Sequence, residues 1–167
     1  MTDAKTNAKH IPFFGGALVG NGPLWTGRRP RGVPLVTVMS AAEATRMRPR
    51  SAHSVIVSIR DPGTPPVPLD ARWAAVLRLE LADISWGGEG DPTAESLAEQ
   101  AEALVAFVHA HRRAPLIAFN CHAGVSRSRT AAAVVCEHYS WPYEWYALHY
   151  AWEAALRTAF SLVCPQT

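Results

Sequence analysis

The sequence contains few cysteines, no long apolar run and no strong excess of charge. Its three cysteines are odd in number and widely spaced, which is typical of free thiols in a reducing compartment. None of their spacings is that of a zinc site, so we expect no bound metal. No segment approaches the roughly 18 apolar residues of a membrane span, and residues 1–10 are too polar for a signal peptide. We therefore expect a cytoplasmic protein without a membrane partner.

The charges nearly balance over the whole chain. The 16 Lys and Arg residues against 14 Asp and Glu residues give a formal net charge of +2, which is too small to favour a nucleic-acid partner. Hydrophobic residues make up 49% and charged residues 18%, which argues against disorder over the full length. At 167 residues the chain has the size of one ordinary domain, and we expect a monomer.

Short apolar segments typical of strands alternate along the chain with segments typical of helices. The predicted strands are residues 34–39, 54–59, 77–81 and 115–119, and leucines alternate with charged residues in the third of them. The predicted helices are residues 41–47, which follow a Ser40–Glu43 capping box, a segment after Asp91-Pro92, residues 127–138 and residues 142–157. This alternation predicts a single α/β domain with a central, largely parallel sheet flanked by helices. Residues 1–33 are predicted to be an N-terminal extension packed on the domain, which occupies residues 34–167.

The segment between the last predicted strand and the helix at 127–138 carries the chemistry. It holds a cysteine, five residues and an arginine, Cys121-His-Ala-Gly-Val-Ser-Arg127, and then Ser128. Successive backbone N–H groups that curve around a helix N-terminus form an anion-binding concavity, and Gly124 relieves the steric limits on that curve. The positive field favours the thiolate of Cys121, and the planar guanidinium of Arg127 fits two phosphoryl oxygens. Ser128 can donate its hydroxyl to the sulfur.

This segment resembles the signature loop of the dual-specificity and tyrosine phosphatases, with Ala123-Gly124 and Ser126-Arg127-Ser128 in the dual-specificity form. The resemblance implies a phosphatase-like fold and hydrolysis of phosphate monoesters through a phosphocysteine, without a cofactor. Its substrate would be a phosphorylated protein, above all one carrying phosphotyrosine, or a small phosphomonoester. In this reading the catalytic residues are Cys121, Arg127, Asp83 and Ser128, and the phosphate-binding residues are His122, Ala123, Gly124, Val125, Ser126 and Arg127.

Asp83 is the preferred general acid among three aspartates. It follows the strand at 77–81, and the carboxyl ends of parallel strands carry the ligand sites of open α/β sheets. The resembled family also has its acid just past this strand. Asp91 is the alternative, although we expect it to cap the helix that begins at Pro92. Asp61 also ends a strand, but Pro62 and Gly63 after it favour a role in a turn.

Asn120 is a departure from the resembled family, which usually has histidine before the nucleophile. Asparagine forms hydrogen bonds but carries no charge, so thiolate activation by this residue would be weaker. Two other functions therefore stay open beside the phosphatase. One is a catalytically weak phosphate-binding pseudophosphatase, and the other is a rhodanese-like sulfurtransferase, against which the Ser-Arg-Ser ending argues. We expect His122 to be solvated and Cys136 to be a buried structural thiol.

Overall fold

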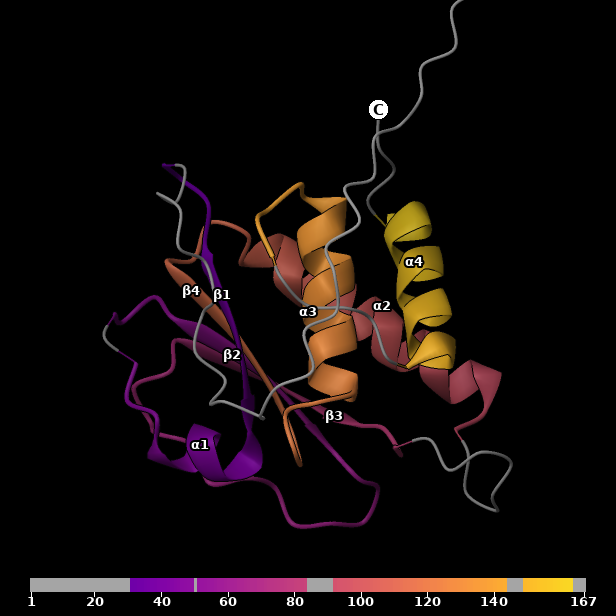
Figure 1. Cartoon of the computed structure of the whole chain (residues 1–167), viewed down its shortest axis with the longest axis horizontal. Coiled ribbons are helices and arrows are strands. Elements are labelled where there is room, and N and C mark those ends of the chain that lie inside the picture. The colour runs from indigo at the N-terminus through magenta and orange to yellow at the C-terminus, as the bar shows by residue number, and fades with distance from the viewer. Residues whose placement is uncertain (1–30, 50, 84–91, 144–148, 164–167) are drawn as a thin grey trace, which may run out of the picture.

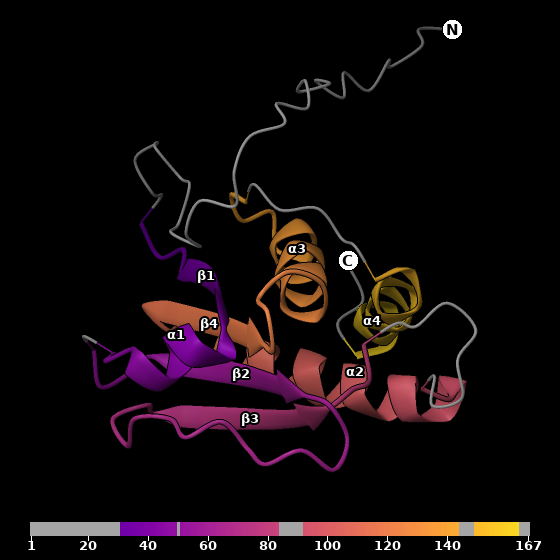
Figure 2. The same ribbon diagram turned by 60° about the horizontal axis from the view of Figure 1, so that its bottom comes forward.

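A parallel four-stranded sheet forms the centre of the domain in the computed structural model, which describes residues 31–49, 51–83, 92–143 and 149–163. The strands are β1 Leu35–Ser40, β2 Val55–Arg60, β3 Ala75–Glu80 and β4 Leu116–Cys121. They lie in the order β1, β4, β2, β3 (Figure 2) and all pair in parallel. The prediction of an α/β domain with a parallel central sheet is confirmed.

The position of each strand in the sheet explains its burial. All residues of β4 are buried, because β4 lies between β1 and β2 with structure on both faces. β3 is an edge strand, and there Val76, Arg78 and Glu80 are exposed while Leu79 is buried. Because the strands are parallel, their carboxyl ends all lie at one edge of the sheet.

Three helices cover one face of the sheet and enclose the larger hydrophobic core. They are α2 Ala94–Ala110, α3 Arg127–His138 and α4 Tyr150–Val163, and they lie to one side of the strands in Figure 1. The core joins Phe119 of β4 to Leu104 of α2 and to Trp152 of α4, all with no exposed surface. In the described part of the chain, no helix is both long and apolar enough to cross a membrane.

The opposite face is covered by the short helix α1 Ala41–Arg46 and by the irregular segment 61–74. Trp73 from that segment packs with Ile56 and Ala118 of the sheet in a second, smaller core. The predicted capping box of α1 is confirmed, because the Ser40 hydroxyl accepts the Glu43 N–H and the Glu43 carboxylate accepts the Ser40 N–H.

The predicted cap of α2 is wrong. We expected Asp91 to cap a helix starting at Pro92, but the N-cap is Thr93, whose hydroxyl accepts the Ser96 N–H at 3.1 Å. The helix begins at Ala94, and Asp91 itself lies outside the described residues. Thr93 satisfies the same need for an acceptor and lies closer to the apolar periodicity that starts at Leu97.

The helix predicted at 142–157 is also wrong in its bounds, because α4 spans Tyr150–Val163 and residues 141–143 are not helical. α3 ends in a Schellman motif, in which Ser140 adopts a φ of 53° and the Trp141 N–H bonds to the Cys136 carbonyl at 2.8 Å. α4 then starts after His149, whose Nδ1 accepts the Trp152 N–H at 3.2 Å. Neither the end of α3 at Ser140 nor the cap of α4 at His149 was predicted from the sequence.

Candidate functional site

Three chemically active side chains follow or end strands at the carboxyl edge of the sheet. Cys121 is the last residue of β4, Asp61 follows β2, and Asp83 lies shortly after β3. Arg127 begins α3, directly after the loop of residues 122–126. Ion pairs join Arg127 to both aspartates, so segments far apart in the sequence meet at one place.

The loop between β4 and α3 is held in place by the end of β1. The Ala41 N–H donates to the His122 carbonyl at 3.1 Å. Gly124 has a φ of 71°, and an added Cβ would lie 2.6 Å from the Met39 carbonyl carbon and 2.7 Å from the Ser40 nitrogen. Glycine is therefore required here twice over, by its left-handed backbone and by the close approach of another backbone segment.

Gly124→Ala should disrupt this loop. Left-handed backbone with a side chain costs about 1–3 kcal/mol, and the clash with β1 adds to it, so we expect a lower free energy of unfolding and loss of oxyanion binding. Urea unfolding and tungstate titration measure the two effects. Gly32→Ala is the matched control, because Gly32 has a φ of 81° with no atom within 4 Å of the added Cβ. Equal effects on oxyanion binding in the two variants would contradict this account of the loop.

The sulfur of Cys121 lies at the N-terminus of α3. Its Sγ is 3.2 Å from the Oγ of Ser128, and the cysteine is only 2% exposed. The Ser128 hydroxyl and the positive end of the helix therefore both lie beside the sulfur. A nucleophilic sulfur at this position can react with an electrophile that the loop binds.

Arg127 is a buried cation with several acceptors around it. The residue is 1% exposed. Its Nη1 donates to Asp61 Oδ1 at 2.9 Å and to the Leu81 carbonyl, and its Nη2 donates to Asp61 Oδ2 at 3.3 Å. The Asp83 Oδ2 lies 3.6 Å from Nη2. Its Nε is buried and has no hydrogen-bond partner among the described residues.

Asp61 is the residue of this group that the sequence reading assigned to a turn. Its backbone does form the turn, because its carbonyl accepts the Thr64 N–H at 3.2 Å. Its side chain, however, contacts Arg127. Burial would raise the pKa of Asp61, but the hydrogen bond and charge of Arg127 outweigh burial, so the pKa lies below its ordinary value. The sequence feature that could have indicated this contact is the position of Asp61 directly after a strand, at the carboxyl edge of the sheet.

Asn120 is buried beside the nucleophile position. It has no exposed surface, and neither its amide nitrogen nor its amide oxygen has a hydrogen-bond partner among the described residues. An asparagine at this position could orient the loop by hydrogen bonds, but no such bond is present among the described residues. An unsatisfied buried amide is unfavourable by about 1–3 kcal/mol.

The remaining residues singled out in the sequence divide into exposed and buried. His122 and Ala123 are exposed, as expected for His122, whereas Gly124 is buried. Cys136 is fully buried in α3, and burial raises the pKa of its thiol to about 12, so it is protonated at neutral pH. The described residues contain no cluster of His, Cys, Asp and Glu that could hold a metal ion.

His149 was missed by the sequence reading. It is 1% exposed, and its backbone N–H donates to the Thr130 hydroxyl of α3 at 3.1 Å. Burial lowers the pKa of His149, which is consistent with the neutral ring that caps α4 through Nδ1. It therefore links the start of α4 to the helix that carries Arg127.

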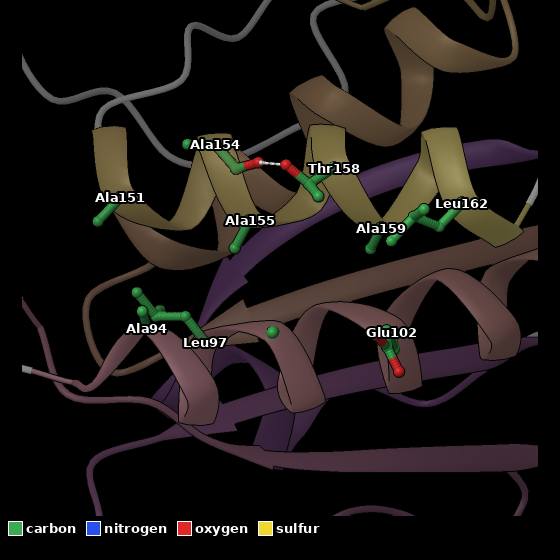
Figure 3. A pocket seen from close by; sticks show the side chains of 10 residues that line it. Ala94, Leu97, Glu102, Ala151, Ala154, Ala155, Thr158, Ala159 and Leu162 are labelled. Atoms are coloured by element: carbon green, nitrogen blue, oxygen red, sulfur yellow. Dashed lines mark hydrogen bonds between the residues drawn. The ribbon is translucent and has the colours of Figure 1, made fainter.

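A hollow of about 410 Å³ lies between α2 and α4 (Figure 3). Its lining is mostly alanine and leucine side chains such as Leu97, Ala155 and Leu162, and Glu102 is its one ionisable residue. None of the residues at the carboxyl edge lines it. Among the described residues, the cysteine, arginine and two aspartates that meet at the carboxyl edge of the sheet lie apart from this hollow.

Neither a protein-family model nor a curated protein matches this sequence. Among solved structures, the human tyrosine phosphatase-like serine/threonine/tyrosine-interacting protein is 13% identical, over 76% of this chain and 91% of its own, with a TM-score of 0.44. A tyrosine phosphatase from the Orf virus is 15% identical, with coverages of 91% and 81% and a TM-score of 0.43. Tk-PTP in its active form is 16% identical, with coverages of 80% and 82% and a TM-score of 0.38. A function for this chain therefore has to be inferred from its own residues.

Proposed function

We propose that this chain is a cysteine-dependent phosphatase that hydrolyses phosphate monoesters. The observation that carries the proposal is the Cys121 Sγ, 3.2 Å from the Ser128 Oγ, at a helix N-terminus that begins with the buried cation Arg127. A nucleophile, a hydroxyl donor and an anion-binding cation thus meet at one helix end. Phosphoryl transfer needs mainly such positioning and positive charge.

In the first step, the Cys121 thiolate attacks phosphorus. The S–P bond forms as the bond from phosphorus to the ester oxygen breaks, and Asp83 gives its proton to the leaving oxygen. Arg127 and the backbone N–H groups of residues 122–127 bind the three equatorial oxygens, whose charge is spread in the transition state. Asp83 lies near this group through its 3.6 Å ion pair with Arg127.

In the second step, water releases the phosphate. The Asp83 carboxylate accepts a proton from the water, whose oxygen attacks phosphorus, and the S–P bond breaks to return the thiolate. The Ser128 hydroxyl donates to that thiolate as it leaves. Asp83 therefore acts as acid in one step and base in the next.

For the substrate, we propose phosphotyrosine or another phosphoprotein residue. The loop of residues 122–126 carries no lysine, which disfavours polyphosphorylated inositol headgroups. The exposed His122 and Ala123 lie at the loop surface, where a peptide substrate would approach. A small phosphomonoester would need the same nucleophile, Cys121, and the same phosphate-binding cation, Arg127, which we call the clamp.

Asn120 favours a second candidate, a phosphate-binding protein with little or no turnover. Its buried amide has no partner among the described residues and supplies no charge to the neighbouring Cys121. In that case the loop and Arg127 would still bind phosphate, while the sulfur of Cys121 would be too poorly aligned to react.

A kinetic panel separates the two candidates. The wild-type protein is assayed with an activated aryl phosphate, a phosphotyrosine peptide, a phosphoserine peptide, an inositol phosphate and a small phosphomonoester. Tungstate binding is measured in parallel. We expect turnover of the aryl phosphate and the phosphotyrosine peptide. Tungstate binding without turnover of any substrate would refute the phosphatase and support the binding protein.

A further inference from the structure

Asp61 contacts both Arg127, the proposed phosphate-binding cation, and Asp83, the proposed general acid. Asp61 follows β2 and lies 66 residues before Arg127, yet its two carboxylate oxygens take Nη1 at 2.9 Å and Nη2 at 3.3 Å. Its Oδ1 also accepts the backbone N–H of Asp83 at 3.4 Å. One carboxylate therefore connects the clamp on α3 to the segment that carries the proposed acid.

Counting the donors of Arg127 shows what Asp61 leaves available. A guanidinium has five N–H donors. Nη1 is used by Asp61 and the Leu81 carbonyl, and Nη2 by Asp61. The Nε donor is buried without a hydrogen-bond partner among the described residues. Asp61 thus accepts hydrogen bonds from Nη1 and Nη2 and leaves the N–H group of Nε available to another acceptor.

A long arginine side chain also needs to be held. Its side chain loses rotational entropy when it is fixed, and a binding site is most effective when its donors are fixed before the ligand arrives. Arg127 is 1% exposed, so its charge needs a counter-ion, while the Asp61 side chain is 41% exposed. The turn at Thr64 fixes the Asp61 backbone, so the carboxylate is itself anchored.

We propose that Asp61 is a positioning residue, which holds the Nη1–Nη2 end of Arg127 so that the Nε edge binds the oxygens of a phosphoryl group. This inference rests on the proposed function for the identity of the ligand. Asp61 acts through Arg127 and does not exchange a proton with substrate. It is thereby distinguished from Asp83, whose ion pair with the same guanidinium is longer at 3.6 Å.

Asp61→Asn tests the inference by two measurements. Asparagine keeps the size of the side chain but loses the charge and the second anionic oxygen. We expect tungstate affinity to fall about tenfold, which corresponds to about 1.4 kcal/mol. We also expect kcat/KM to fall by a similar factor for aryl phosphates with good and with poor leaving groups, since Arg127 binds the phosphoryl group of both. A loss of kcat/KM that does not depend on the leaving group would indicate weaker binding of the phosphoryl group by Arg127.

Glu80→Gln is the matched control, because it removes the Arg60–Glu80 ion pair near the same sheet edge without touching Arg127. Asp61→Glu keeps the charge but moves it by one methylene, so its tungstate affinity should lie between those of wild type and Asp61→Asn. Thermal unfolding checks that each variant is folded, and Asp61→Glu alone decides the outcome if Asp61→Asn does not fold.

Three results would overturn the inference: an unchanged tungstate affinity in the Asp61 variants, a tighter one, or a rate loss confined to poor leaving groups. The tighter affinity would make Asp61 a competitor of phosphate, and the leaving-group effect would make it an acid. If the wild-type protein hydrolyses no substrate but Asp61→Asn binds tungstate more weakly than wild type, the phosphatase is refuted and the role of Asp61 is supported. A wild-type protein that binds no oxyanion would refute both.

Discussion

Cys121→Ser is expected to abolish turnover while tungstate binding persists. The serine hydroxyl is a weak nucleophile unless a base activates it, so the S–P intermediate cannot form and no equivalent replaces it. Arg127, the loop N–H groups and the N-terminus of α3 are unchanged, and these are the groups that we propose to bind the oxyanion. Steady-state hydrolysis of an aryl phosphate and tungstate titration measure the two properties separately.

Cys136→Ala is the control for this prediction. Cys136 is also a buried thiol and lies on α3, but burial raises the pKa of its thiol to about 12, so it has no thiolate at neutral pH. We expect a small loss of stability from the lost sulfur and nearly unchanged turnover. Wild-type-like hydrolysis by Cys121→Ser would exclude the covalent mechanism. Loss of turnover in both variants would show only that α3 is sensitive to packing.

The fold was largely predictable because its strands and helices carry local signals. The apolar segments of β2 and β4 and the alternation in β3 gave the parallel sheet, and the capping box of α1 was read correctly. The errors lie at helix starts, where several residues can serve as cap. Asp91 and Thr93 both suit that role, and the start of α4 depends on an imidazole cap, His149, which is rare enough to be overlooked.

The candidate site was predictable where it is continuous in sequence. Cys121, Gly124, Arg127 and Ser128 lie within one loop and helix start, so spacing alone joins them. The contact of Asp61 with Arg127 spans 66 residues, and no local pattern reports it. The Asn120 amide has no partner among the described residues, and this too depends on what surrounds it in the folded chain. Sheet topology was the available guide, because Asp61 and Asp83 both follow parallel strands at the edge where Cys121 ends β4.

The two aspartates beside Arg127 differ in ways that suit different tasks. Asp61 makes the shorter contacts with the guanidinium, and the charge and hydrogen bond of Arg127 hold its pKa below the ordinary value although burial opposes this. It therefore stays ionised at neutral pH. The Asp83 side chain is 51% exposed and lies farther from the guanidinium, at 3.6 Å. An ionised carboxylate suits the positioning role that we propose for Asp61, and a more accessible carboxyl group suits the acid role that we propose for Asp83.

Asp83→Asn should therefore slow hydrolysis according to the leaving group. General acid catalysis is typically worth ~10² to 10⁴ in rate, and we expect a loss of this size with phosphotyrosine or phenyl phosphate, whose leaving oxygens need a proton. The loss should be much smaller with an activated aryl phosphate, whose leaving oxygen carries negative charge readily. A plot of log kcat/KM against leaving-group pKa measures the difference as a steeper slope in the variant. Asp70→Asn is the control, since Asp70 pairs with Arg48 and Arg72 and does not contact Arg127 in the described structure. A steep slope in Asp91→Asn, with none in Asp83→Asn, would transfer the role of acid to Asp91.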